Sequence, residues 1–400
     1  MSVGLLTSAS APQNLNAVSF AQAITRLMPN GTAPLFGLTS LLKDETASNI
    51  EHGYFSKTMI FPSATLSAAV ADGAATTFTV ASNSDIVAGD LLMAESTQEI
   101  VLVTSVPSTT SIVVTRGVGT VAAAAIASGV ALRTVGNAFE EGSTRPSAVS
   151  IIAERYVNNT QIFRNSWAVT KTAAAIPQIA GAGYVSESKQ DCAALHAMAI
   201  EKALFFGQKF MGTRNGQPFH TMEGIIPRVV AAAPGNITTL GSTTNWTQLE
   251  AALDPVLQTV TDPKGGNIRT MFVGGTARRV LHNIARLNSS YQITTAETAW
   301  GLQIDTIRTP RGVFEIIEHP LFNAYGASSV WAKMAVVCDL NAFALAYLRK
   351  TSDAGYNAAG ALVDNGVDAE GGTLTTELTC TIKNPAAFGI LYNFTAAAAG

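Results

Sequence analysis

Alternating apolar and polar residues between Phe55 and Trp167 predict extended strands over most of this stretch. Two arms, roughly Tyr54–Ser63 and Ala138–Val169, carry the alternation and flank a central module at about residues 65–137. We predict that neither arm ends in a helix. A module carried on a two-stranded arm is poorly placed to cover its own core and well placed to reach a neighbouring copy. The pattern therefore indicates assembly before it indicates catalysis.

Short strands follow one another at even spacing in the central module. We predict them at Thr77–Val80, Leu91–Ala94, Glu99–Val106, Ser111–Thr115 and Val130–Arg133. Turn-forming residues such as Ala88-Gly89-Asp90 and Ser128-Gly129 separate them. Strands every ~8–12 residues between such turns are typical of a small β-sandwich or barrel, so we expect residues 65–137 to be a separate β-only fold unit.

The period changes to that of a helix between Ser186 and Gly207. Apolar residues recur at helical spacing at Ala193, Ala197, Ile200 and Leu204. Acidic residues stand in the first turns and Lys202 near the end, which matches the helix dipole. We predict a helix of ~30 Å that forms the spine of a domain.

After Gly224, helices and strands alternate, which predicts an α/β or α+β domain on a mixed sheet. Helices are predicted at Trp246–Val260, with a perturbation at Pro255, and at Gly275–Leu287. Strands are predicted at Thr270–Val273, Ile304–Arg308, Val313–Glu318, Lys333–Cys338, Ala342–Leu348, Thr373–Ile382 and Ile390–Phe394, with a loop over residues 353–372. At the other end, Phe20–Met28 predicts a weakly amphipathic helix, and the first 50 residues are either a disordered terminus or an arm that orders on a neighbour.

Charged residues make up only 13% of the 400 residues, about half the usual share for a soluble domain. A surface with so few charges is either small or covered by protein partners. The net charge of -3 argues against tight, sequence-reading binding of nucleic acid. No apolar stretch reaches the ~20 residues that span a membrane, and three distant cysteines, Cys192, Cys338 and Cys380, are predicted to be reduced and buried.

Candidate chemistry is sparse. Ser186-Glu187-Ser188-Lys189 matches S-x-x-K, but the other motifs of penicillin-recognising enzymes are missing, so we interpret Ser186 as a helix cap. Gly274-Gly275 before Arg278-Arg279 predicts a plain strand-to-helix turn with solvated arginines. The histidines lack metal-ligand spacing, and Asp364, Asp368 and Glu370 lack the alternation of a calcium loop. We predict no catalytic, cofactor-binding or metal-binding residues.

The order of these segments resembles the major capsid proteins of tailed bacteriophages with the Hong Kong 97-type fold. The resemblance is strongest to the subfamily that carries a β-domain inserted in its extended loop, and it covers roughly residues 35–395. The segments that carry it are Gly89-Asp90-Leu91-Leu92, Val103-Thr104-Ser105-Val106, Arg116-Gly117, Gly119-Thr120-Val121-Ala122-Ala123, Glu141-Gly142-Ser143, Asn159-Thr160-Gln161-Ile162-Phe163, Met222-Glu223-Gly224-Ile225 and Asn384-Pro385-Ala386-Ala387-Phe388-Gly389. Each segment alone is a weak match, and their order and spacing make it specific.

The resemblance implies an α+β subunit that assembles into hexamers and pentamers and closes an icosahedral shell around packaged DNA. It also implies a division of the chain. The parts are an N-terminal arm at 1–53, an extended loop at 54–64 and 138–170, an inserted β-domain at 65–137, a peripheral domain at 171–225 and 370–400, and an axial domain at 226–369. The implied partners are further copies of the chain, a portal, scaffolding or decoration proteins, and double-stranded DNA in non-specific contact. The implied location is the virion, after assembly in the host cytoplasm and without a membrane.

Charges that stand out in this charge-poor chain are our candidates for contacts between subunits. They are Glu140, Glu141, Arg145, Arg155 and Arg164. The resemblance leaves two alternatives open: an encapsulin-like nanocompartment shell with the same fold, and a β-rich virion adhesin or tail component suggested by the central module.

Overall fold

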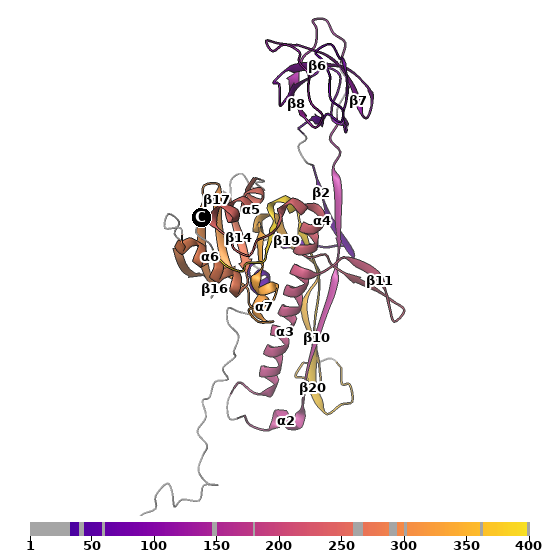
Figure 1. Cartoon of the computed structure of the whole chain (residues 1–400). Helices are drawn as coiled ribbons and strands as arrows, with labels where there is room; N and C mark the ends of the chain where they lie inside the picture. The colour runs from indigo at the N-terminus through magenta and orange to yellow at the C-terminus, as the bar shows by residue number, and fades with distance from the viewer. Residues whose placement is uncertain are drawn as a thin grey trace, which may run out of the picture. The chain divides into compact units, whose positions relative to one another are not determined.

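The computed structural model describes residues 33–39, 44–57, 61–145, 150–178, 181–258, 267–287, 294–299, 302–360 and 363–397 (Figure 1). The chain divides into two compact units, Phe55–Arg155 and the remainder, Met1–Tyr54 with Tyr156–Gly400. Each unit has hydrophobic core residues of its own. The predicted helix at Phe20–Met28 lies outside the described residues.

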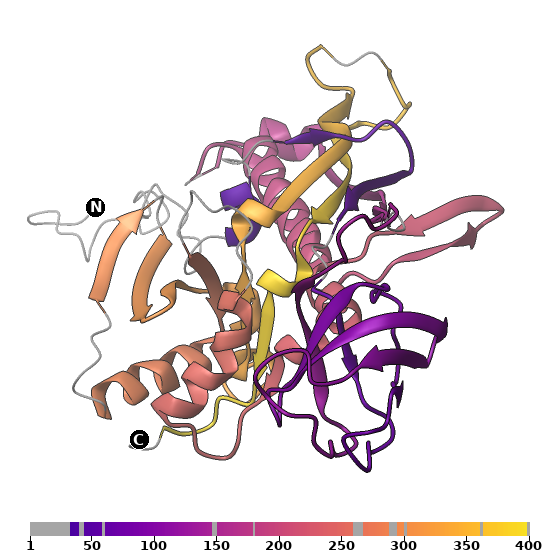
Figure 2. The ribbon, with the colours of Figure 1, turned by 90° about the horizontal axis from the view of Figure 1, so that it is seen from above.

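Unit Phe55–Arg155 is built on one six-stranded sheet in the order β3-β8-β5-β6-β7-β4. Its strands are β3 (Ser63–Thr65), β4 (Thr77–Thr79), β5 (Asp90–Ala94), β6 (Ile100–Ser108), β7 (Ser111–Thr115) and β8 (Ala131–Asn137). All five strands predicted in this region are present, and β3 is added to them. Register shifts in β5–β8 and β6–β7 bend the sheet, whose curl is visible in Figure 2. Alternate residues such as Leu92, Val101 and Ile112 are fully buried in its core.

The two arms meet in a two-stranded sheet of β2 (Glu51–Ser56) and β9 (Glu154–Asn159). From β9 the chain passes into β10 (Gln161–Thr170) and directly into the short helix α2 (Lys171–Ala175). The returning arm, predicted to run to Val169 without ending in a helix, is thus a strand through Thr170, and α2 beyond it was not predicted. The Thr170 hydroxyl accepts a hydrogen bond from the Ala173 N–H and caps α2, a local signal that the strand alternation concealed.

Helix α3 (Tyr184–Phe206) is the predicted spine and packs on β10 and β20 of a four-stranded sheet in the order β1-β19-β20-β10. The sheet contains β1 (Glu45–Thr46), β19 (Phe343–Tyr356) and β20 (Ala369–Ile382). The predicted loop over residues 353–372 is wrong at both ends, because β19 and β20 stay paired as far as Tyr356 and Gly371. Small and polar residues fill these strand ends, so the sequence there lacked a strand signal.

The domain after Gly224 contains a mixed seven-stranded sheet in the order β13-β21-β18-β14-β17-β16-β15, as the alternation predicted. The strands are β13 (Ile237–Thr239), β14 (Ile268–Val273), β15 (Thr294–Ala299), β16 (Leu302–Thr309), β17 (Gly312–Glu318), β18 (Ala335–Cys338) and β21 (Gly389–Tyr392). A turn of 3₁₀ helix, η3 (Trp331–Lys333), takes the first residue of the strand predicted at Lys333–Cys338. Two further turns, η4 (Leu340–Ala342) and η5 (Pro385–Ala387), precede β19 and β21.

Helices α5 (Trp246–Gln258) and α6 (Gly275–Leu287) bury one face each in the core of this domain. The perturbation expected at Pro255 is absent, since α5 continues through it to Gln258. Leu253, Val256 and Leu257 are buried on either side of the proline, and we infer that their packing offsets the hydrogen bond that Pro255 cannot make.

Several short elements were not predicted from the sequence. They are α1 (Pro34–Thr39), the hairpin β11 (Phe210–Arg214) and β12 (Gln217–Thr221), α4 (Ile225–Ala232), η2 (Pro234–Asn236) and α7 (Pro320–Asn323). Most of them are too short to show a hydrophobic period. Three of them, α1, α4 and the hairpin, contribute to the surfaces described next.

Candidate assembly surfaces

Tyr54 and Tyr156 fix the base of the β2–β9 arm. Their rings lie 5.5 Å apart between centroids, and the Tyr54 hydroxyl donates to the Ile382 carbonyl of β20. The Tyr156 hydroxyl donates to the Glu223 carboxylate, and the Arg228 guanidinium of α4 lies over the Tyr156 ring. Burial, together with Glu223, raises the pKa of Tyr156 well above its ordinary value, so this hydroxyl remains a donor.

Asn158 ties the same arm to the body of its unit. Its amide nitrogen donates to the carbonyls of Glu223 and Cys380, and its amide oxygen accepts from the Glu223 N–H. Asn158 is 1% exposed, so these bonds are shielded from water. The end of β9, in the returning arm, is therefore held by buried hydrogen bonds.

Glu201 anchors the N-terminal segment to the spine helix. Its carboxylate is fully buried and accepts from the N–H groups of Leu35 and Phe36, at 2.8 Å each. His319 Nε2 lies 2.7 Å from the carboxylate, while His319 Nδ1 accepts from the Leu321 N–H. Since Nδ1 is an acceptor, the ring proton is on Nε2 and donates to Glu201. Helix α1 thus supplies two of the three hydrogen-bond donors that stabilise this carboxylate inside the core.

Helix α3 is attached to its sheet by polar contacts as well as by packing. His196 bridges Asn165 of β10 and Thr376 of β20 at 2.9 and 2.8 Å, and burial lowers the pKa of His196. Nearer the start of the helix, the Lys189 ammonium lies 4.5 Å from the centroid of the Trp167 ring and 3.9 Å from Asp353. Helix α3 is therefore attached to the strands of this sheet at two places along its length, through His196 and through Lys189.

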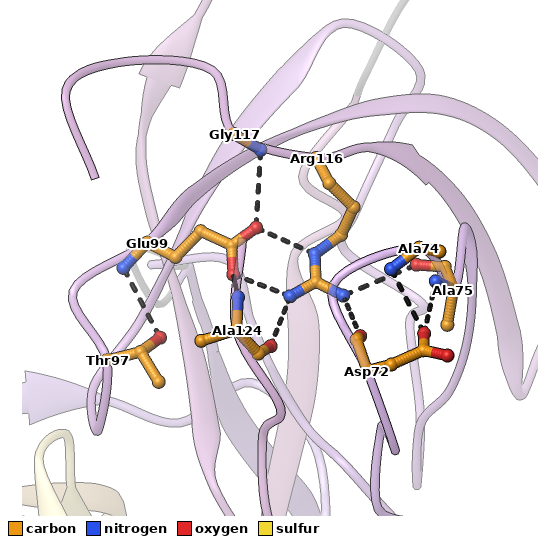
Figure 3. A network of polar contacts seen from close by, with 8 residues as sticks. All are labelled: Asp72, Ala74, Ala75, Thr97, Glu99, Arg116, Gly117 and Ala124. Atoms are coloured by element: carbon orange, nitrogen blue, oxygen red, sulfur yellow. Dashed lines mark hydrogen bonds and ion pairs between the residues drawn. The ribbon is translucent and has the colours of Figure 1, made fainter. Parts of the chain in front are cut away.

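Within unit Phe55–Arg155, a buried ion pair joins Glu99, which precedes β6, to Arg116, which follows β7 (Figure 3). Glu99 is fully buried and accepts from Arg116 Nε at 2.7 Å and Nη2 at 2.6 Å, and also from the N–H groups of Gly117 and Ala124. Arg116 donates onward to the carbonyls of Asp72 and Ala124. Burial alone would raise the pKa of Glu99, but these hydrogen bonds outweigh it and lower the pKa.

The five predicted contact residues fall in three places. Glu140 and Arg145 line one cavity of about 410 Å³ in unit Phe55–Arg155, where the Phe139 ring packs over Gly89, and Glu141 is exposed beside it. Arg155 is exposed on β9, and Arg164 is exposed on the face of β10 that points away from α3. The structure brings together only Glu140 and Arg145 around a common cavity.

Large exposed apolar side chains accompany these charges. In unit Phe55–Arg155, Phe61 and Ile152 are 83% and 84% exposed, and Phe55 is 71% exposed. In the other unit, the β11–β12 hairpin exposes Phe210, Met211 and Phe219. Contiguous exposed apolar surface marks contact with partners. These residues were not predicted as contacts from the sequence, although an aromatic residue at an outward strand position was the available signal.

The other chemical predictions have mixed outcomes. The cap interpretation of Ser186 is wrong, because α3 begins at Tyr184 after Gly183 and Ser186 lies inside the first turn. Arg278 is not solvated either, because it binds Asp305 at 2.6 Å and Glu318 at 2.9 Å, while Arg279 is exposed. The prediction that all three cysteines are free and buried is confirmed.

In the part of the chain that the structure describes, no three or more His, Cys, Asp or Glu side chains are arranged to hold a metal ion. Among the same residues, no helix is long and apolar enough to cross a membrane. The strongest features of the described surface are thus a rigid arm base and exposed apolar side chains, which suit a subunit of a protein assembly.

Comparison with known proteins identifies that assembly. Residues 7–395 match the SU10 major capsid protein family, and the chain belongs to this family. It is 39% identical over 398 residues to the major capsid protein of Pseudomonas phage PaMx41, covering 96% of this chain and 93% of that protein. Its function is therefore that of a phage major capsid protein, a structural component of the virion.

Solved structures agree on the fold. The chain superposes on a structure from Mycobacterium phage Bobi with a TM-score of 0.51 at 10% identity, covering 97% of this chain and 99% of that one. It superposes on the capsid of a native GTA particle with a TM-score of 0.50 at 8% identity, covering 98% of each. The predicted α+β, Hong Kong 97-type capsid fold is confirmed, and family membership sets aside the nanocompartment and adhesin alternatives.

Proposed function

We propose that copies of this chain form hexamers and pentamers that close an icosahedral head, with the extended arm of each subunit lying on a neighbour. The observation that carries this proposal is the β2–β9 arm. Its base is locked by Tyr54, Tyr156 and Asn158, while Phe55, Phe61 and Ile152 beyond it are largely exposed. A rigid base with apolar side chains in solvent supports burial of those side chains by another copy.

The chain parts then have distinct roles in the shell. We assign residues 1–53 to an N-terminal arm, 54–64 and 138–170 to the extended loop, and 65–137 to an inserted β-domain. The peripheral domain is 171–225 with 370–400, and the axial domain is 226–369. Two strands cross these bounds, because β19 pairs with β20 of the peripheral part and β21 pairs with β18 and β13 of the axial part. Repetition of modest contacts in every copy stabilises the closed shell, so no catalytic residue is required.

Further partners belong to the same proposal. A portal, a scaffolding or decoration protein and double-stranded DNA complete the head, with DNA in non-specific contact. The low net charge of -3 supports weak rather than sequence-specific contact with DNA.

Glu140, Glu141 and Arg145 are the proposed polar contacts of the returning arm, with Arg155 and Arg164 as further candidates. The test is a Glu140→Gln, Glu141→Gln double variant, compared with Asp85→Asn, Glu95→Gln, which makes the same charge change in the same unit. We expect the first variant to melt normally as a subunit but to give fewer shells, most clearly at raised salt, because screening weakens the remaining charge contacts. Equal shell yields for the two variants across a salt series would refute a contact role for Glu140 and Glu141.

A further inference from the structure

The β11–β12 hairpin is an ordered two-stranded ribbon that the rest of its unit leaves almost uncovered. It is an isolated two-stranded sheet whose strands pair from Phe210↔Thr221 to Arg214↔Gln217. Asn215 and Gly216 close it with positive φ angles of 53° and 73°, the conformation that a tight hairpin turn requires. Figures 1 and 2 both show it projecting from its unit.

The base of the hairpin is fixed to the end of β9 and to Thr160, which follows it. Lys209 Nζ donates to the Val157 carbonyl at 2.8 Å, and the Asn159 amide donates to the Phe210 carbonyl at 3.2 Å. His220 Nδ1 also contacts the Thr160 carbonyl. An isolated two-stranded hairpin is only marginally stable in water, so these contacts and the turn preorganise it.

The surface of the hairpin is apolar and basic. Phe210 and Met211 are each 56% exposed, and the Phe210 and Phe219 rings lie 6.2 Å apart between centroids. No Asp or Glu occurs from Gly207 to Met222, whereas Arg214 is exposed at the turn and makes no ion pair with any residue that the structure describes. A partner for this surface needs apolar side chains and a carboxylate.

The far end of the β19–β20 ribbon has the complementary composition. No Lys or Arg occurs from Thr351 to Ile382, and Asp364 and Asp368 are both exposed there. Val363 and Val367 are 64% and 56% exposed beside them. The Asn357 amide donates to Asn365, Val367 and Ala369, and these bonds tie residues 365–369 to the residue that follows β19.

We propose that the β11–β12 hairpin of one copy docks on the end of the β19–β20 ribbon of a neighbouring copy. Arg214 pairs with Asp364, and the apolar side chains of the hairpin pack on Val363 and Val367. Asp364 is the preferred partner, because Asp368 lies 4.0 Å from Lys171 of its own chain. Both elements are preorganised, so little ordering entropy is lost when they meet.

Charge reversal tests the pairing. This contact rests on the proposed assembly. The reference is therefore the shells that the wild-type chain forms, measured by sedimentation and negative stain. A wild-type chain that formed no shells would refute the assembly itself. We expect Arg214→Glu and Asp364→Arg each to remove most of the shell fraction while leaving circular dichroism unchanged. The double variant should restore shells, and Arg308→Glu, a control at another exposed arginine, should assemble normally.

A cysteine pair gives a second readout that does not depend on assembly yield. The three native cysteines are buried and free, so they should not react; Gln217→Cys with Val367→Cys introduces two exposed thiols at the proposed contact. Oxidised shells should give a ladder of linked subunits on a non-reducing gel, and unassembled subunits should not. Full assembly of both single charge variants, failure of the double variant to recover, or intact shells of the cysteine pair without a ladder would each overturn the proposed contact.

Discussion

The Arg228 guanidinium lies 3.5 Å from the centroid of the Tyr156 ring, and this contact joins helix α4 to strand β9 of the returning arm. The Tyr156 hydroxyl binds Glu223, which directly precedes the Gly224 cap of α4. One aromatic side chain therefore connects the arm to both ends of a short segment, residues 223–228. This small cluster holds the unit-side end of β9 against α4.

Loss of the Tyr156 hydroxyl should weaken the arm base. Tyr156→Phe keeps the ring under Arg228 but removes a donor to a carboxylate, a bond typically worth ~1.5–3 kcal/mol. We expect a comparable decrease in the free energy of unfolding in urea, with shell assembly impaired more than folding. Tyr184→Phe, at a tyrosine that is 43% exposed, is the matched control and should change little. Indistinguishable unfolding curves for the two variants would contradict a structural role for the Tyr156–Glu223 bond.

His196 should make the stability of the subunit depend on pH. Burial holds its pKa below the unfolded value of ~6.5, so the folded chain binds the proton more weakly than the unfolded chain does. The contribution of neutral His196 is therefore complete above about pH 6.5 and decreases as the pH falls below that value. Urea unfolding from pH 8 to 5 should show this loss, and His196→Gln should remove that part of the slope. An unchanged slope in His196→Gln would exclude His196 as its source.

The periodic elements could be predicted from the sequence, and the contacts between them could not. Helix α6 was predicted with the bounds observed, because Val280, Ile284 and Leu287 give a clear helical face. The ends of β19 and β20 were missed because their residues are small or polar and form strands only through pairing with each other. Five of the six strands of the central module were predicted, since turn residues separate them, and the three-residue strand β3 was missed.

The key polar residues of the assembly surfaces had weaker signals in the sequence. Glu201 lies on the apolar face of α3 between Ile200 and Leu204, and an acid at such a position was a usable sign of a buried partner. Its partners, α1 and His319, are 165 residues before and 118 residues after it in the chain. No local pattern connects residues at that separation, so only the folded chain reveals the anchor.

Removal of Arg116 should unfold the module far more readily than removal of an exposed arginine. Arg116→Met leaves Glu99 buried without its cation, a change that typically costs ~3–5 kcal/mol. Arg133→Met, which breaks the exposed pair with Glu95, should cost ~0–1 kcal/mol. Hydrogen exchange of the Gly117 and Ala124 amides, which bind Glu99, is the measurement. Equal protection of these amides in both variants would show that the buried pair does not hold this loop.

Mature heads should not be cross-linked through a lysine of the extended loop. Some relatives that the fold resembles join such a lysine to an asparagine of a neighbouring subunit. No lysine occurs from Thr58 to Thr170 in this chain; Lys57 sits at the base of the arm and Lys171 beyond its end, so the outer part of the arm lacks the amine required. Denatured particles should therefore run as single subunits on a gel, and covalently linked rings would contradict the prediction.

Deletion of the central module should leave the rest of the subunit folded. Every core residue of unit Phe55–Arg155 lies between Ala64 and Leu132, and none of them belongs to the other two clusters. Ser63 and Arg133 are directly paired across β3 and β8, so an Asn-Gly turn can join them in place of residues 64–132. We expect the shortened chain to keep the helical circular dichroism of α3, α5 and α6 but to form unstable or aberrant shells. Loss of that helical signal would show that the module supports the core of the other unit.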